Sequence, residues 1–134
     1  MIKNVAIGLA LLLGISTGAN GLFMLLAPEA WYWAVPGVTT TGPFNQHFIR
    51  DIGLIFLLLS AALLTGVARP DLRTLLWSGT AIWMAGHALF HFWEVAVGIC
   101  SSSALSRDFP AVTLPALLTG SLALWALRED RRKR

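Results

Sequence analysis

The chain alternates long apolar runs with short polar connections, and each run is about long enough to cross a lipid bilayer. The runs cover approximately residues 5–27, 45–68, 72–97 and 111–127. At 1.5 Å per residue the first run measures about 34 Å, whereas the last is barely long enough for a bilayer core. The sequence therefore predicts an all-α membrane protein in which residues 1–134 form a single domain, an antiparallel bundle of four transmembrane helices.

Three connections join these runs. Residues 28–44 begin with Pro28, which suits the first turn of a short helix, and carry a Trp-Tyr-Trp cluster typical of the lipid headgroup level. We expect this segment to be an aromatic interfacial loop. The tight turn at 69–71 makes the second and third helices antiparallel neighbours. Residues 98–110, which include Arg107 and Asp108, are expected to form a loop.

The first run also has a rival interpretation. Lys3, a short apolar core and the small residues at 17–19 resemble a secretory signal with a cleavage site, which would remove residues 1–19. Apolar character resumes at Leu22, whereas a true signal would give way to polar mature sequence. We therefore expect a first transmembrane helix that is retained.

Basic residues set the expected orientation. Cytoplasmic loops carry an excess of Lys and Arg, and the connections divide these residues eight against two. The eight are Lys3, Arg69, Arg73, Arg128, Arg131, Arg132, Lys133 and Arg134, and the two are Arg50 and Arg107. Both termini are therefore predicted to be cytoplasmic.

Composition supports a membrane protein and excludes other classes. The 134 residues are 56% hydrophobic and only 13% charged, about half the charged fraction of a soluble domain. The net charge of +3 is concentrated at the C-terminus and accompanies no DNA- or RNA-binding pattern, so a nucleic-acid partner is not expected. The single cysteine, Cys100, excludes an internal disulfide.

The third run contains the most unusual polar pattern. His87, His91 and Glu94 interrupt an otherwise apolar segment at spacings of four and three. Because a helix turns about 100° per residue, these side chains fall within a wedge of roughly 60°. Three residues of metal-ligand type therefore lie on one stripe of a helix of bilayer length.

A second polar group is expected at the same depth. If both termini are cytoplasmic, the second helix begins near the non-cytoplasmic surface, and its first turns carry His47, Arg50 and Asp51. The third helix ends near the same surface, and its last turns carry His91 and Glu94. Charged side chains in a bilayer cost about 2.5 to 3.5 kcal/mol each on insertion scales, and they persist when paired or when they serve a site. We therefore expect these residues to face the bundle interior and converge, with Arg50 neutralising a carboxylate.

Several functions fit such a cluster, and the sequence leaves them open. The first is a metal site for zinc, copper or non-haem iron, with His87, His91, Glu94, His47 and Asp51 as ligands. The second is a quinone held against His47 and Asp51, with Arg50 beside them. The third is haem b between His47 and a histidine of the third helix. We rank these three kinds of ligand in that order. Each would give the protein a redox-linked or accessory role.

A structural interpretation competes with all three. The polar residues could form a hydrogen-bonded network that fixes two helices together in a non-catalytic assembly subunit. Polar contacts between membrane helices contribute only about 0.6 kcal/mol on average, so six such residues exceed what helix association requires. Beyond the bilayer, a larger membrane complex or a homo-oligomer is the expected partner. The sequence does not decide whether the protein is an enzyme.

The segment from the first apolar run to the start of the second, under half of the chain, carries a family resemblance. Gly21, Pro28 and the segment Gly42-Pro43-Phe44-Asn45-Gln46-His47-Phe48-Ile49-Arg50-Asp51-Ile52-Gly53 resemble the small four-helix bacterial inner-membrane proteins of the DoxX-like group. The resemblance implies a four-helix bundle in a bacterial-type inner membrane, with quinone-linked redox chemistry in some members. Only Arg50 and Asp51 match as a polar pair, and the residues of the third helix have no counterpart in that pattern.

Overall fold

The computed structural model describes residues 2–132, and within that range every regular element is a helix or helical turn and no strand occurs. The prediction of an all-α fold is confirmed. The elements are α1 (Ile2–Leu26), α2 (Pro28–Ala34), the 3-10 turn η1 (Val38–Thr40), α3 (Gln46–Ala68), α4 (Arg73–Ala96), α5 (Ser103–Asp108), the π-helical turn η2 (Phe109–Thr113) and α6 (Leu114–Arg132).

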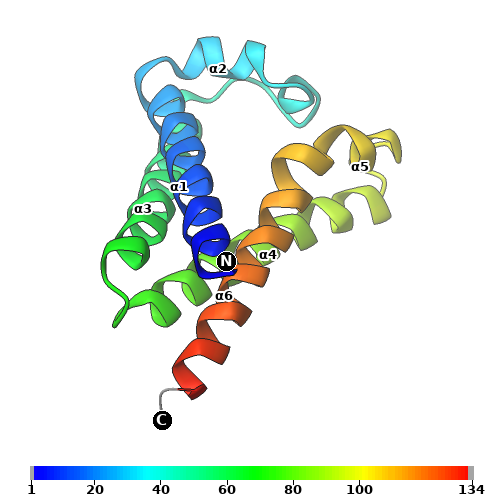
Figure 1. Ribbon diagram of the computed structural model, residues 1–134. Coiled ribbons are helices and arrows are strands. Elements are labelled where there is room, and N and C mark those ends of the chain that lie inside the picture. Colours follow the sequence, from blue (N-terminus) through cyan, green and yellow to red (C-terminus); the bar gives the residue numbers. More distant parts are fainter. Residues whose placement is uncertain (1, 133–134) are drawn as a thin grey trace.

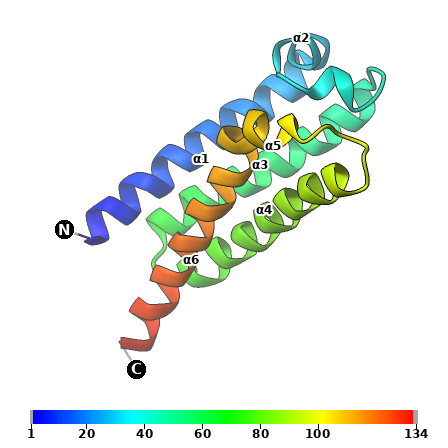
Figure 2. The same cartoon turned by 90° about the vertical axis from the view of Figure 1, so that its right-hand side faces the viewer.

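The four long helices pack as two antiparallel pairs. α1 lies against α3, and α4 lies against α6, with α3 and α4 joining the pairs. In both views the start of α1, the α3–α4 turn and the end of α6 lie at one end of the bundle, which we call the terminal end (Figures 1 and 2). α2 and α5 lie at the opposite end, which we call the α2–α5 end.

Among the described residues, three helical segments are long and apolar enough to cross a membrane: Ile2–Leu26, Gln46–Ala68 and the continuous stretch Ser103–Arg132. α4 is 24 residues long, about 36 Å at the helical rise, but it is not among them. Its interior carries His87, His91 and Glu94, and such polar residues lower its mean hydropathy. The sequence prediction of four spans is thus supported for three segments.

Small residues bring α1 and α3 into close contact. A Cβ at Gly21 would lie 2.8 Å from the backbone oxygen of Gly53, and one at Gly18 would lie 2.6 Å from Oγ of Ser60. Ser60 Oγ also donates a hydrogen bond of 2.7 Å to the carbonyl of Gly14. Close backbone approach through small residues, with hydroxyl bonds across it, is a recurrent way for helices to associate in lipid.

At the terminal end, an arginine closes the last turn of α3. Arg73 is buried, and its Nε donates to the carbonyl of Gly66 at 2.7 Å. The guanidinium also lies over the rings of Trp77 and Trp125, 5.2 and 5.6 Å from their centroids. A cation at a helix C-terminus complements the helix dipole, so Arg73 stabilises the point where α3, α4 and α6 meet.

The α3–α4 turn carries an ion pair of its own. Arg69 donates two hydrogen bonds to Asp71, of 3.1 and 2.8 Å. These bonds favour the charged carboxylate and lower the pKa of Asp71. The turn is tight, as the sequence predicts, and α4 begins at Arg73.

At the α2–α5 end, the aromatic residues of α2 fix it to α1 and to the connection that precedes α3. Trp31 Nε1 donates to Oδ1 of Asn20 at 2.9 Å, and the hydroxyl of Tyr32 donates to the carbonyl of Gly42 at 2.8 Å. Asn20, the strongly polar residue inside the first apolar run, thus serves to anchor α2. The expected short helix at Pro28 is present.

The segment expected to be the third loop is largely helical. α5 begins at Ser103, and the helix runs without a break through η2 into α6. Pro110 lacks an amide hydrogen and would disturb an α-helix. The chain accommodates it in η2, where the amide of Leu114 donates to the carbonyl of Phe109 in a π-helical bond. Arg107 and Asp108 are therefore presented on a helical turn rather than on a loop.

Candidate functional site

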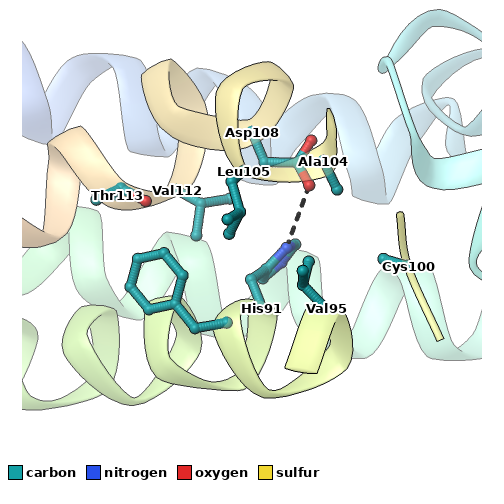
Figure 3. Close-up of a pocket in the computed structure, with 9 residues that line it drawn as sticks. His91, Val95, Cys100, Ala104, Leu105, Asp108, Val112 and Thr113 are labelled. Carbon is teal, nitrogen blue, oxygen red and sulfur yellow. Dashed lines mark ion pairs between the residues drawn. The ribbon is translucent and has the colours of Figure 1, made fainter. Parts of the chain in front are cut away.

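An ionisable pair joins α4 to α5 near the α2–α5 end. Nδ1 of His91 lies 3.4 Å from Oδ2 of Asp108 (Figure 3). Arg107 donates to both oxygens of the same carboxylate, at 2.7 Å from Nε and 3.1 Å from Nη2. Asp108 thus lies between a guanidinium and an imidazole, and the three side chains form one connected group, the His91–Asp108–Arg107 cluster.

The side chains of this cluster are partly buried. The His91 and Asp108 side chains are 26% and 15% exposed. The guanidinium of Arg107 also packs against Gly37, in the connection between α2 and η1, so closely that a Cβ at Gly37 would overlap it. Gly37 has a φ of +88°, a backbone conformation in which glycine is strongly favoured. The cluster therefore links the α2 connection to α4 through α5.

His87 extends the cluster along α4. Its ring is 4.8 Å from that of His91 in an edge-on arrangement and is stacked on Trp83 at 5.1 Å, with 15° between the ring planes. Trp83 in turn meets Phe56 of α3 edge-on at 5.5 Å. A continuous line of aromatic and imidazole rings therefore runs from the α3–α4 interface to Asp108.

His47 and Asp51 form a separate pair on α3. Nε2 of His47 lies 3.2 Å from Oδ2 of Asp51, one helical turn away, and the side chains are 87% and 55% exposed. Within residues 2–132, no ion pair or hydrogen bond connects this pair to His87, His91 or Glu94. The expected convergence of the two polar groups is not seen, because the partner of His91 comes from α5 and not from α3.

Arg50 has different partners from the expected carboxylate. Its Nε donates to the carbonyl of Leu25 at 3.2 Å, and its Nη1 donates to Oε1 of Gln46 at 2.8 Å. The carbonyl belongs to the last turn of α1, where a cation complements the helix dipole. Arg50 thus closes α1 as Arg73 closes α3.

Glu94 is buried, with 9% of its surface exposed, in the last turns of α4. Its backbone carbonyl accepts hydrogen bonds from the amides of Ile99 and Cys100, at 2.9 and 3.2 Å, which close the C-terminus of the helix. Within residues 2–132, no hydrogen bond or ion pair joins its carboxylate to a histidine. Glu94 therefore lies beside the cluster without entering it.

The metal-ligand geometry expected from the sequence does not form in the part of the chain that the structure describes. No group of three or more His, Cys, Asp or Glu side chains lies close enough to hold one ion there. The sequence-predicted residues instead divide into the pair His47–Asp51, the two adjacent histidines of α4 and the separate Glu94. A tetrahedral or octahedral ion needs more converging ligands than any of these provides.

A small cavity lies beside His91, between α4 and the α5–η2 segment. Its volume is about 10 Å³, and its wall includes His91, Phe92, Cys100, Leu105, Asp108 and Thr113. That space suits about one water molecule. A larger ligand can therefore reach His91 only through the exposed part of its side chain, which is 26% of its surface.

The chain matches no protein-family model, no curated protein and no solved structure. The DoxX-like resemblance stays a prediction, and the function has to be argued from the geometry.

Sequence reasoning missed Asp108 and Arg107 as members of the site. Both residues were assigned to a loop, and loops offer no periodicity from which to infer a facing partner. The available signal was the adjacent opposite charges next to Pro110, in a connection that otherwise contains no charged residue. Together with the end of α4, that pair is a source of a carboxylate for His91 from outside α4.

Proposed function

We propose that the chain is a four-span membrane protein whose non-cytoplasmic end binds a lipid-soluble ligand of the quinone class through His91. The membrane part of this proposal rests on the order of the helices. α3 ends at the terminal end, and the Ser103–Arg132 segment starts at the opposite end. If both of these apolar segments cross the bilayer, α4 has to cross it between them, despite its polar residues.

The orientation follows from charge. Among the residues that the structure describes, Lys3, Arg69 and the basic residues of 128–132 gather at the terminal end, whereas Arg50 and Arg107 belong to the other end. The positive-inside rule then assigns the terminal end to the cytoplasm. His91 lies five residues before the end of α4, about 8 Å along the helix axis, and so within the non-cytoplasmic leaflet.

The His91–Asp108 contact carries the functional proposal. A carboxylate facing Nδ1 favours a proton on that nitrogen and leaves Nε2 as a hydrogen-bond acceptor. Such an imidazole can accept the hydroxyl proton of a bound quinol, or donate to a quinone carbonyl when it is fully protonated. Arg107 holds the carboxylate in place through two hydrogen bonds.

The surroundings of His91 suit an apolar ring. His87 lies edge-on to His91, and Trp83 and Phe56 continue this line of rings away from His91 toward α3, while Phe90, the residue before His91, is about half exposed. Aromatic rings attract one another in stacked and edge-on arrangements. For a metal ion, the same region offers two imidazoles and one carboxylate, and the carboxylate is already bonded to Arg107. A metal ion is therefore a weaker candidate than a quinone.

Ligand analysis of the purified protein tests this proposal. Protein from native membranes in a mild detergent should carry a stoichiometric quinone on solvent extraction and chromatography, and a His91→Ala variant should lose it. Metal analysis and a visible spectrum of the same sample distinguish the alternatives. A stoichiometric transition metal or a haem Soret band would overturn the quinone assignment. A helical, well-behaved protein with none of the three would indicate a purely structural role.

A further inference from the structure

A second site is suggested by a groove at the terminal end of the bundle. The groove has a volume of about 410 Å³ and lies among α1, the α3–α4 turn and α6. Its wall combines the apolar side chains of Ile7, Val67 and Trp125 with the charged side chains of Lys3, Arg73 and Glu129. None of these residues belongs to the His91–Asp108–Arg107 cluster.

Arg73 gives the groove a buried positive charge. Arg73 is 8% exposed, and no carboxylate lies within 4 Å of its guanidinium among residues 2–132. Its known contacts are the carbonyls of Gly66 and Val67 and the two indole rings described above. These carbonyl bonds use two of the five donor hydrogens of the guanidinium.

The other charged residues keep the groove positive. Lys3 is exposed on the first turn of α1. Within residues 2–132, Glu129 is the one acidic residue in the wall, and its Oε1 lies 3.5 Å from Arg132 Nη1. The pairing offsets its charge, so Lys3 and Arg73 determine the sign of the potential within the groove.

The shape and the chemistry match one class of ligand. Basic pockets between membrane helices on the cytoplasmic side bind the headgroups of anionic lipids. A phosphodiester would face Lys3 and Arg73, and its acyl chains would continue along the apolar wall that Ile7 and Trp125 provide. A free phosphate would use the charges and leave that wall without a role.

We propose that this groove binds the phosphate of an anionic phospholipid from the cytoplasmic leaflet. The inference uses the membrane orientation proposed above but not the ligand of His91, so the two proposals fail separately. An exposed lysine near a membrane surface contributes roughly a fivefold change in affinity for anionic lipid. The contribution of Lys3 can therefore be measured without disturbing the buried Arg73.

Native mass spectrometry tests the site in detergent micelles that contain equal amounts of phosphatidylglycerol and phosphatidylcholine with identical acyl chains. The wild-type protein should retain one phosphatidylglycerol in preference to phosphatidylcholine, and Lys3→Gln should reduce that preference about fivefold. Arg131→Gln removes an exposed basic residue from the same end without touching the groove. It serves as the matched control and should reduce the preference less than Lys3→Gln does, because Arg131 is not part of the wall of the groove.

Three outcomes would overturn the proposal. Equal retention of the two lipids would show that the groove does not select for charge. An equal loss in the Lys3 and Arg131 variants would assign the preference to general surface charge. Displacement of the bound lipid by millimolar inorganic phosphate would identify a site for the free anion. A His91→Ala protein that still retains phosphatidylglycerol separates this site from the proposed quinone site.

Discussion

The guanidinium of Arg107 occupies the space that a side chain at Gly37 would need. This contact joins two segments that are 70 residues apart in the sequence, at the α2–α5 end of the bundle. Gly37 provides the space and the left-handed backbone conformation, and Arg107 holds Asp108 toward His91. The geometry of the ionisable pair therefore depends on a loop residue that carries no chemistry of its own.

Replacing Gly37 by alanine should weaken the whole α2–α5 end. The positive φ alone costs roughly 1–2 kcal/mol for a residue with a Cβ, and the added carbon also displaces Arg107. We expect a lower melting temperature in detergent, measured by intrinsic fluorescence. Gly79→Ala is the control, because nothing lies within 4 Å of a Cβ at that helical position. Equal stability of the two variants would contradict the contact.

Gly21→Ala should separate α1 from α3. A Cβ at this position would meet the backbone oxygen of Gly53 at 2.8 Å, and a backbone atom cannot move aside as a flexible side chain can. Overpacking of this kind costs about 1–3 kcal/mol. Gly8→Ala on the same helix meets nothing within 4 Å and should be neutral or slightly stabilising. Reversible unfolding in mixed micelles measures both, and an unaffected Gly21 variant would contradict the close approach.

The bond between Trp31 and Asn20 should couple α2 to α1. A double-mutant cycle with Asn20→Ala and Trp31→Phe should give a coupling energy near 0.6 kcal/mol, the average for polar contacts between membrane helices. The cycle isolates the coupling of this pair, because contacts that each substitution removes independently, such as that of Asn20 with Met24, cancel in the difference. Additive effects would mean that the indole does not bind Asn20.

His47→Ala should leave the protein nearly unchanged. The His47–Asp51 pair is highly exposed and lies within one helix, and exposed pairs contribute about 0–1 kcal/mol. Stability and ligand content should both stay at the wild-type level. Loss of the bound ligand in this variant would restore the sequence-based hypothesis that His47 belongs to the site.

Sequence reasoning predicted the helices well because lipid imposes a simple rule. A span needs about 20 apolar residues whatever its neighbours are, so α1 and α3 could be placed within a few residues. The prediction of a loop at 98–110 was wrong from Ser103 onward, where the chain is helical. Pro110 indicates a helix break, but the π-helical turn at Phe109–Thr113 accommodates it.

The site was less predictable because its partners come from different elements. The stripe of His87 and His91 on one helix face was visible in the sequence, and the structure places their rings side by side. The sequence could not reveal which neighbouring element faces that stripe of α4. Arg50 was also expected to neutralise a carboxylate, whereas its guanidinium donates to the carbonyl of Leu25 and to the side chain of Gln46.

The account depends most on His91 as the residue that binds the ligand, with Asp108 orienting it. Its most direct test is a fluorescence titration of the purified protein with a short-chain quinol, for the wild type and for His91→Ala, Asp108→Asn and His47→Ala. Loss of one hydrogen bond of about 1.5 kcal/mol predicts roughly tenfold weaker binding for His91→Ala. Asp108→Asn should also weaken binding, and His47→Ala should not change it. Equal affinity in the wild type and the His91 variant would contradict the account.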